Sequence, residues 1–160
     1  MKKQEKTNVM RILDKLRLSY KFHCYADTDA VSGTEVAEVL GQNPECVFKT
    51  LVTSAKSGTY YVFMVPVEEE LDLKKAAACV NEKSVSMIKS KDLLPVTGYI
   101  HGGCSPIGMK KQFVTVIHDT AQNFETIFFS AGKIGYQIEM NFNELKKAVD
   151  IKTADIIVKK

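Results

Sequence analysis

The sequence is organised around Gly98-Tyr-Ile-His-Gly-Gly-Cys-Ser-Pro-Ile-Gly-Met-Lys-Lys111. This stretch carries four glycines, one proline and two terminal lysines between flanks that have the patterns of ordered structure. Glycine lets the backbone turn with little side-chain obstruction, so successive amide groups can line a concave surface. Such a surface suits an anion or an oxygen that develops negative charge. The plainer interpretation is a set of tight turns between strands.

A second glycine-lysine loop follows an apolar run at Ser130-Ala-Gly-Lys-Ile-Gly135. Two such loops in a small domain predict one pocket with two walls. Neither is the phosphate-binding loop of nucleotide hydrolases: Gly103 and Gly108 have the right separation, but Met109 stands where that motif needs lysine. The dinucleotide-binding fingerprint is absent as well, so the sequence disfavours a nucleotide triphosphatase.

The composition is that of one globular domain over residues 1–160, with 45% hydrophobic and 26% charged residues. A formal net charge of +3 is too small for a protein that coats DNA, so any polyanion has to meet a local patch. Of the 22 basic residues only Arg11 and Arg17 are arginine. Lysines must therefore make most of the contacts with anions.

The sequence does not predict export or a membrane span. No apolar run has the length of about 18 residues that a bilayer requires, and the start Lys3-Gln-Glu-Lys6 lacks the apolar core of a signal peptide. We therefore expect a cytoplasmic protein. Four scattered cysteines in a chain of this size favour free, reduced thiols.

Hydrophobic spacing at helical period predicts helices over 7–18, 34–40 and 71–80, and a final helix that Asn141 or Asn143 caps and that ends at 149. Thr7 or Asn8 is expected to cap the first of these helices, and Asp72 the third. A helical turn over 91–94 is expected to stop at Pro95. Within the second helix we expect three side chains to face inward: Val36, Val39 and Leu40.

Alternating or β-rich segments predict strands over 20–25, 47–55, 59–65, 84–88, 113–118, 125–129, 138–140 and 155–158. Hairpins and short connections are too frequent for regular βαβ winding. The predicted fold class is α/β mixed (α+β), a mixed β-sheet with helices packed around it.

Lys49 lies within a strand that otherwise favours burial, between Phe48 and Leu51 in the pattern Val-Phe-Lys-Thr-Leu-Val. Burial of an ammonium without a partner is costly. Either Lys49 points to solvent on the polar side of the strand, or its stem packs on apolar neighbours and its charge is offered to a ligand.

Metal and thiol chemistry have weak support. A zinc site would need His101 and Cys104 plus ligands from distant single residues, and no second closely spaced pair is present, so we expect no metal and no cofactor. Cys104 as a nucleophile with His101 as its base is the other possibility. No carboxylate pair or Ser-His-Asp arrangement stands out. What remains is a site rich in backbone donors, with lysine nearby, that can hold an ester carbonyl and stabilise its oxyanion.

Several separated motifs, in this order, resemble the YbaK/EbsC family, free-standing relatives of the editing domain in bacterial prolyl-tRNA synthetases. The likeness covers almost the whole chain. It is carried by Phe48-Lys49-Thr50-Leu51, Leu71-Asp72-Leu73-Lys74-Lys75, Thr97-Gly98-Tyr99, the glycines of the 102–111 loop with Ser105-Pro106 and Lys110-Lys111, and Ser130-x-Gly132-Lys133-x-Gly135.

The resemblance implies a YbaK-like editing-domain fold and hydrolysis of mischarged tRNA in trans. The branch that looks most similar is the Cys-tRNA(Pro) deacylases, in which the thiol of the misattached cysteine attacks its own ester. Mischarged tRNA(Pro) and prolyl-tRNA synthetase are the implied partners. A deacylase for Ala-tRNA(Pro) or another small residue, and a non-catalytic module that binds tRNA or a synthetase, are the alternatives.

The resemblance also assigns site residues. Lys49 is implied as the essential pocket lysine, and Gly102 and Gly103 as the amides that face the ester. Substrate-binding roles are implied for Tyr25, Ser105, Ser130, Gly132 and Lys133. The chain departs from the family pattern at three positions: Cys104 stands where relatives usually carry an aliphatic residue, Phe129 replaces a common tyrosine, and Gln137 stands where many relatives carry aspartate.

Overall fold

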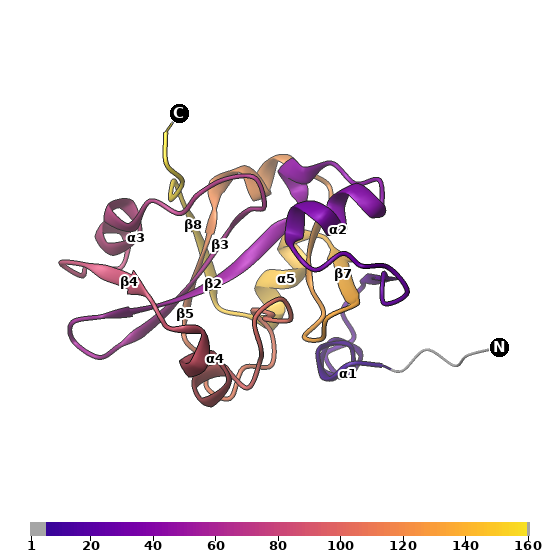
Figure 1. Cartoon of the computed structure of the whole chain (residues 1–160), viewed down its shortest axis with the longest axis horizontal. Coiled ribbons are helices and arrows are strands. Elements are labelled where there is room, and N and C mark those ends of the chain that lie inside the picture. Colours follow the sequence, from indigo (N-terminus) through magenta and orange to yellow (C-terminus); the bar gives the residue numbers. More distant parts are fainter. Residues whose placement is uncertain (1–5, 160) are drawn as a thin grey trace.

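Two β-sheets form the frame of the molecule in the computed structural model, which describes residues 6–159 (Figure 1). The helices are α1 (Asn8–Lys15), α2 (Gly33–Val39), α3 (Leu73–Cys79), α4 (Ser90–Thr97) and α5 (Phe142–Ala148). The strands are β1 (Lys21–Cys24), β2 (Phe48–Ala55), β3 (Tyr60–Pro66), β4 (Val85–Met87), β5 (Val114–His118), β6 (Ile127–Ser130), β7 (Tyr136–Met140) and β8 (Ile151–Ala154). None of the described helices has the length and apolar character needed to cross a bilayer. Residues 1–5, which contain most of the stretch used for the export prediction, lie outside the described part.

The larger sheet is mixed, as the short connections predict. Its strand order is β4-β2-β3-β5-β8. The hairpin β2–β3 is antiparallel and pairs Lys49 with Val65, while β3–β5 and β5–β8 are parallel. This sheet contains the strand that positions Lys49.

A second sheet corrects the expectation of a single one. It has the order β1-β7-β6, with antiparallel pairing throughout. A parallel bridge between Val47 and Phe128 marks the point at which the two sheets meet. Alternation along a strand predicts the strand but not its partners, so the sequence alone could not separate the two groups.

The main core lies between the two sheets. Val62, Met64 and Ile117 of the larger sheet share one apolar cluster with Phe129 and Ile138 of the smaller sheet, and α1, α4 and α5 close this cluster at its edges. A second cluster packs α3 against the other face of the larger sheet. Burial on both faces makes the larger sheet a rigid support for residues at its edge.

The helix ends follow the predicted capping residues in α1, α3 and α5. Thr7, Asp72 and Asn141 each accept a hydrogen bond from a backbone N–H in the first turn. Helix α2 begins with a capping box between Ser32 and Glu35. The prediction that Val39 faces inward is wrong, since its side chain is 50% exposed. A helix of this length buries a narrow stripe, and here the stripe passes through Val36.

Pro95 does not stop α4, contrary to the prediction. The helix continues to Thr97 and ends at Gly98, whose φ is 87°. Proline removes one backbone donor, but the last turn is still held. The hydroxyl of Thr97 donates to the Leu93 carbonyl at 2.7 Å, and the N–H of Gly98 donates to the Leu94 carbonyl at 2.8 Å.

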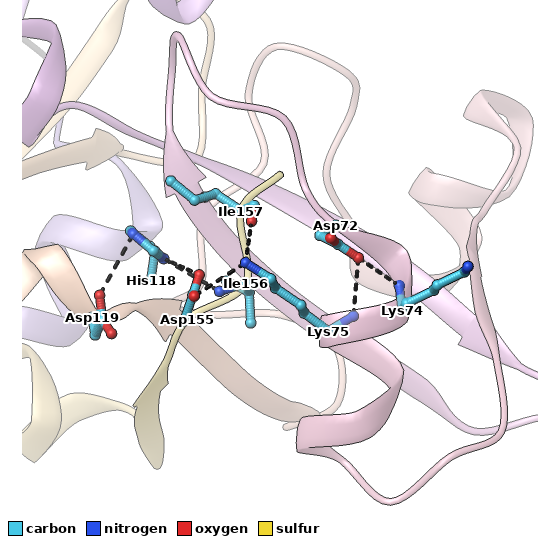
Figure 2. A network of polar contacts seen from close by, with 8 residues as sticks. All are labelled: Asp72, Lys74, Lys75, His118, Asp119, Asp155, Ile156 and Ile157. Carbon is cyan, nitrogen blue, oxygen red and sulfur yellow. Dashed lines mark hydrogen bonds and ion pairs between the residues drawn. The ribbon is translucent and has the colours of Figure 1, made fainter. Parts of the chain in front are cut away.

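The predicted strand over 155–158 is also wrong, because the last strand is β8 and ends before this segment. The segment forms only an isolated antiparallel bridge, between Leu71 and Ile157, with backbone hydrogen bonds of 2.8 and 2.9 Å on either side of it. Side chains add further contacts (Figure 2). The ammonium of Lys75 donates to Asp155 at 3.1 Å and to the Ile157 carbonyl at 2.9 Å, and the N–H of Ile156 donates to Nδ1 of buried His118 at 3.3 Å. The segment has the apolar pattern of a strand because Ile156 and Ile157 pack in the same cluster as α3.

Candidate active site

A cavity of about 420 Å³ opens between α2, the start of β2, the loop that follows α4, and the adjoining ends of β6 and β7. Its volume is in the range of about 300–1,000 Å³ usual for small-molecule sites. Four of the predicted site residues line it: Tyr25, Lys49, Gly102 and Ser130. Four different segments of the chain and both sheets therefore contribute to one cavity.

The two glycine-lysine loops touch each other beside this cavity. A β-carbon at Gly103 would lie 3.2 Å from the backbone nitrogen of Ile134. Gly102 has a φ of 87°, and a β-carbon there would lie 3.2 Å from Cγ1 of Val31, on the segment before α2. Because a side chain at Gly102 would be strained and crowded, glycine keeps this part of the backbone open to the cavity.

Gly132 lies on the far side of its loop, away from the cavity. A β-carbon there would lie 2.9 Å from the ring of Tyr99 and 3.0 Å from Val9 of α1. The buried hydroxyl of Tyr99 in turn donates to the Ile107 carbonyl of the first loop. Tyr99 therefore joins the two loops to each other, and Val9 of α1 packs against the second loop at the same glycine.

The other predicted site residues lie behind or beside the lining. Ser105 is fully buried, and its Oγ accepts a hydrogen bond from the Ile107 N–H at 3.3 Å. Gly103 is buried and does not line the cavity, and its N–H donates to the Ile100 carbonyl at 3.0 Å. Lys133 is exposed, and its Nζ lies 5.4 Å from the ring centre of Tyr136, which lines the cavity.

Lys49 is partly buried in the cavity wall, which favours the ligand-facing interpretation over the solvent-facing one. Burial lowers the pKa of its ammonium, and the carboxylates of Glu70 and Glu69 oppose that shift. Among residues 6–159 no hydrogen-bond partner of Nζ is found. The ammonium is therefore available to an oxygen of a bound molecule.

Two residues with neutral hydroxyls line the same cavity as this charge. Burial raises the pKa of Tyr25, which keeps its phenol protonated. Thr50, next to Lys49 in β2, also lines the cavity, and its buried Oγ1 has no hydrogen-bond partner in the described part of the chain. A buried hydroxyl without a partner is costly, so a ligand oxygen or water would satisfy it.

The sequence did not single out Thr50 or Glu35 as site residues, although both line the cavity. The feature of the sequence that could have indicated them is a polar side chain next to positions that are predicted to be apolar. That β2 and the start of α2 line the same cavity depends on tertiary packing, which the pattern does not contain.

Cys104 and His101 both line the cavity, yet they lack the features of a nucleophile and its base. Burial raises the pKa of the Cys104 thiol to about 12, against a lowering by its hydrogen bond with Thr97. The thiol is therefore neutral near pH 7 and unreactive. His101 is exposed. The described residues contain no group of three or more His, Cys, Asp or Glu side chains that could hold a metal ion.

The arrangement suits an ester better than a reaction that needs a protein nucleophile. The Gly102 backbone can approach a carbonyl oxygen, and Lys49 supplies positive charge at the same cavity. A bound acyl group would lie among apolar side chains that include Val31, Leu93 and Phe129. The attacking group must then be water or part of the substrate.

Comparison with known proteins points to one family. The model of the aminoacyl-tRNA editing domain matches residues 23–148. A protein from Enterococcus faecalis (strain ATCC 700802 / V583), named "Putative Cys-tRNA(Pro)/Cys-tRNA(Cys) deacylase EbsC", is 47% identical over 140 residues, which cover 87% of this chain and 85% of that protein.

Solved structures share the fold. One, described as "putative trans-editing enzyme for prolyl tRNA synthetase", superposes with a TM-score of 0.81 at 20% identity and covers 96% of this chain and 99% of its own. Another, described as "hypothetical protein APE2540", has a TM-score of 0.85 at 19% identity and covers 94% of this chain and 99% of its own. At these identities the likeness concerns architecture.

Proposed function

The chain belongs to the aminoacyl-tRNA editing domain family, and on this premise we propose that it hydrolyses mischarged Cys-tRNA(Pro), and also Cys-tRNA(Cys), in trans. The observation that carries the proposal is that Lys49 and Gly102 line the same cavity, which contains no activated protein nucleophile. The substrate assignment follows the name of the relative from Enterococcus faecalis.

The ester linkage would lie between Gly102 and Lys49. The amide of Gly102 would stabilise the oxygen that becomes negative when the carbonyl is attacked. The N–H of Gly103 already donates to the Ile100 carbonyl at 3.0 Å, so it is not available to the ester. Lys49 holds the terminal nucleotide or polarises the carbonyl by its charge. Its position in a strand buried on both faces gives that charge a fixed place, so little reorganisation is needed at the moment of reaction.

The nucleophile is the thiol of the misattached cysteine. Its sulfur attacks the carbonyl carbon of the same residue, the ester C–O bond breaks, and the ribose hydroxyl leaves with the proton that the thiol released. The immediate product is a four-membered thiolactone, which water opens to free cysteine. Such a route needs only that the site hold the cysteinyl group of the substrate with its sulfur close to its own carbonyl carbon. This requirement agrees with the lack of an activated nucleophile among the lining residues.

The remaining predicted residues divide into two groups. Tyr25 and Ser130 line the cavity and would contact the substrate directly. Ser105, Gly132 and Lys133 would act through the loops, because Ser105 is buried, Gly132 packs on Tyr99, and Lys133 lies over Tyr136.

Release of cysteine from purified Cys-tRNA(Pro) tests the function. We expect a rate far above that in buffer, and a rate equal to buffer would overturn the proposal. A panel with Cys-tRNA(Cys), Ala-tRNA(Pro) and correctly charged Pro-tRNA(Pro) decides the substrate. Hydrolysis of the alanyl ester at the same rate would contradict the thiol route, since alanine has no side-chain nucleophile.

The partners we propose are mischarged tRNA and prolyl-tRNA synthetase, in the cytoplasm. The synthetase follows the description of one structural neighbour. Co-purification of the synthetase after ribonuclease treatment would support direct contact, and its loss on that treatment would show that tRNA links the two proteins.

A further inference from the structure

The charged side chains around the cavity are divided by sign. Residues 26–48, which include α2, carry five carboxylates and neither lysine nor arginine. The carboxylates belong to Asp27, Asp29, Glu35, Glu38 and Glu45. Ser32, Gly33 and Glu35 of this segment line the cavity, so one side of it is acidic.

The two glycine-lysine loops, residues 98–111 and 130–135, form another part of the lining, which meets the acidic segment where a β-carbon at Gly102 would lie 3.2 Å from Val31. These loops carry Lys110, Lys111 and Lys133 and no carboxylate. All three lysines are exposed. The first loop also contains Gly102, so it leads from the cavity lining to a pair of surface cations.

Helix α1 extends the basic side. A β-carbon at Gly108 would lie 3.0 Å from Cδ1 of Ile12 and 3.3 Å from Nδ2 of Asn8, so the helix packs against this loop. Arg11 and Lys15, one helical turn apart, are exposed. The carboxylate of Asp14 is already engaged, since it accepts hydrogen bonds from Lys6 and from the hydroxyl of Tyr20.

From this division we infer that Arg11, Lys15, Lys110 and Lys111 bind the phosphate backbone of the RNA whose 3′ end occupies the cavity. The inference rests on the proposed function. In Figure 1, α1 and α2 lie on opposite sides of β7. A polyanion that leaves the cavity is repelled on the side of α2 and attracted on the side of α1. The division of charge thus fixes the direction in which the acceptor strand runs.

These contacts are electrostatic and independent of base sequence. Each neutralised phosphate releases counterions, so binding weakens as salt rises, with a slope that reports the number of contacts. This property provides a test that a purely structural role of the four cations would not satisfy.

The test compares two charge-removing pairs, R11Q/K15Q and K110Q/K111Q, with the control pair K56Q/K83Q. Lys56 and Lys83 are exposed and belong to neither the loops nor α1. The affinity for uncharged tRNA is measured between about 50 and 200 mM salt. For each test pair we expect about 10-fold weaker binding at low salt and a log–log slope shallower by about two. The control pair should change affinity less than about twofold.

A second readout separates this inference from the proposed function. The cysteinyl ester of adenosine carries no phosphate, so both test pairs should hydrolyse it at the wild-type rate while losing kcat/KM toward Cys-tRNA(Pro). If both test pairs bind tRNA with the affinity and the salt slope of the wild type, the inference is wrong. That result would also be obtained if this surface binds an acidic protein and not RNA. An equal loss in the control pair would overturn it too. Failure of the wild type to hydrolyse either ester would instead refute the proposed function, and the tRNA affinities would still decide the surface.

Discussion

The side-chain amides of Gln42 and Gln137 hydrogen-bond each other twice. Nε2 of Gln42 donates to Oε1 of Gln137 at 2.7 Å, and Nε2 of Gln137 donates to Oε1 of Gln42 at 2.9 Å. Gln137 belongs to β7, lines the cavity and is 3% exposed, while Gln42 follows α2. The pair therefore ties the acidic side of the cavity to the smaller sheet.

The two amides should be energetically coupled, so the losses of stability caused by removing each of them should not add up in the double variant. Gln42→Ala leaves the buried amide of Gln137 with unsatisfied groups, and we expect the free energy of unfolding to fall by about 1–3 kcal/mol. The double variant Q42A/Q137A should be destabilised by less than the sum of the single effects. Urea denaturation of the four proteins measures this coupling, and strictly additive losses would contradict it.

Lys49→Ala should abolish deacylation without unfolding the protein. A lost charge or donor at the reacting centre typically lowers kcat by about 10²–10³-fold. The control is Lys56→Ala, which removes a lysine from the exposed turn at the other end of the same strand. Cysteine release and the far-ultraviolet circular dichroism of both variants give the result. Activity in K49A close to that in K56A would remove Lys49 from the site.

Activity should fall at high pH as Lys49 loses its proton. Burial sets the pKa of Lys49 below the ordinary value of 10.5, so the charge is lost before that of an exposed lysine. Glu70 opposes this shift, and Glu70→Gln should therefore move the alkaline limb of kcat/KM to lower pH. The substrate thiol titrates equally in both proteins, so the comparison isolates the lysine.

The same lysine gives stability the opposite pH dependence. Between the lowered pKa of Lys49 and 10.5 the unfolded chain binds more protons than the folded one, so the contribution of Lys49 to stability rises with pH in that window.

For the activity, identical alkaline limbs of kcat/KM in the wild type and E70Q would show that Lys49 does not govern the pH profile.

Gly102→Ala should impair activity more than its cost in stability explains. The matched control is Gly58→Ala, because Gly58 has a φ of 88° and no neighbour within 4 Å of a β-carbon. Both variants should lose about 1–2 kcal/mol of stability through strain in the left-handed region. A β-carbon at Gly102 also meets Val31 at the cavity, so only G102A should lower kcat/KM, by about 10-fold or more. Equal activity in the two variants would contradict an approach of the substrate to the Gly102 backbone.

Cys104→Ala should retain deacylation. The raised pKa of its thiol keeps it neutral, so it has no nucleophilic role to lose. We expect a rate within about threefold of wild type, with a modest loss of stability from the truncated buried side chain. Iodoacetamide should label Cys104 slowly in the folded protein and rapidly in urea. A loss as large as that of K49A would restore the cysteine-nucleophile hypothesis.

Much of the fold could be predicted from the sequence where local chemistry decides it. Caps at Thr7, Asp72 and Asn141, and the hairpin from β2 to β3, follow from residues close together in the chain. The second sheet could not be predicted, because strand partners depend on distant pairings such as that of β1 with β7. Segment 155–158 has the pattern of a strand but forms only the isolated bridge from Ile157 to Leu71, because burial under α3 and strand pairing select the same apolar residues.

The candidate site was predictable in its parts but incompletely in its arrangement. In the sequence, the loops are recognised as clusters of glycine, and Lys49 as a charged residue within an otherwise apolar strand. That Gly102 lines the cavity while Gly132 faces Tyr99 depends on which side of each loop is turned inward. Composition does not contain that information.

The packing of α1 against both loops bears on how small a working fragment can be. The segment that resembles the editing family, residues 23–148, excludes α1 and also β8, the neighbour of β5. A fragment trimmed to those bounds would leave Gly108 and Gly132 without the helix that backs them and would expose an unpaired sheet edge. The smallest active fragment should therefore include α1 and β8, which pack against or pair with the site-bearing elements, although both lie outside the segment that matches the family.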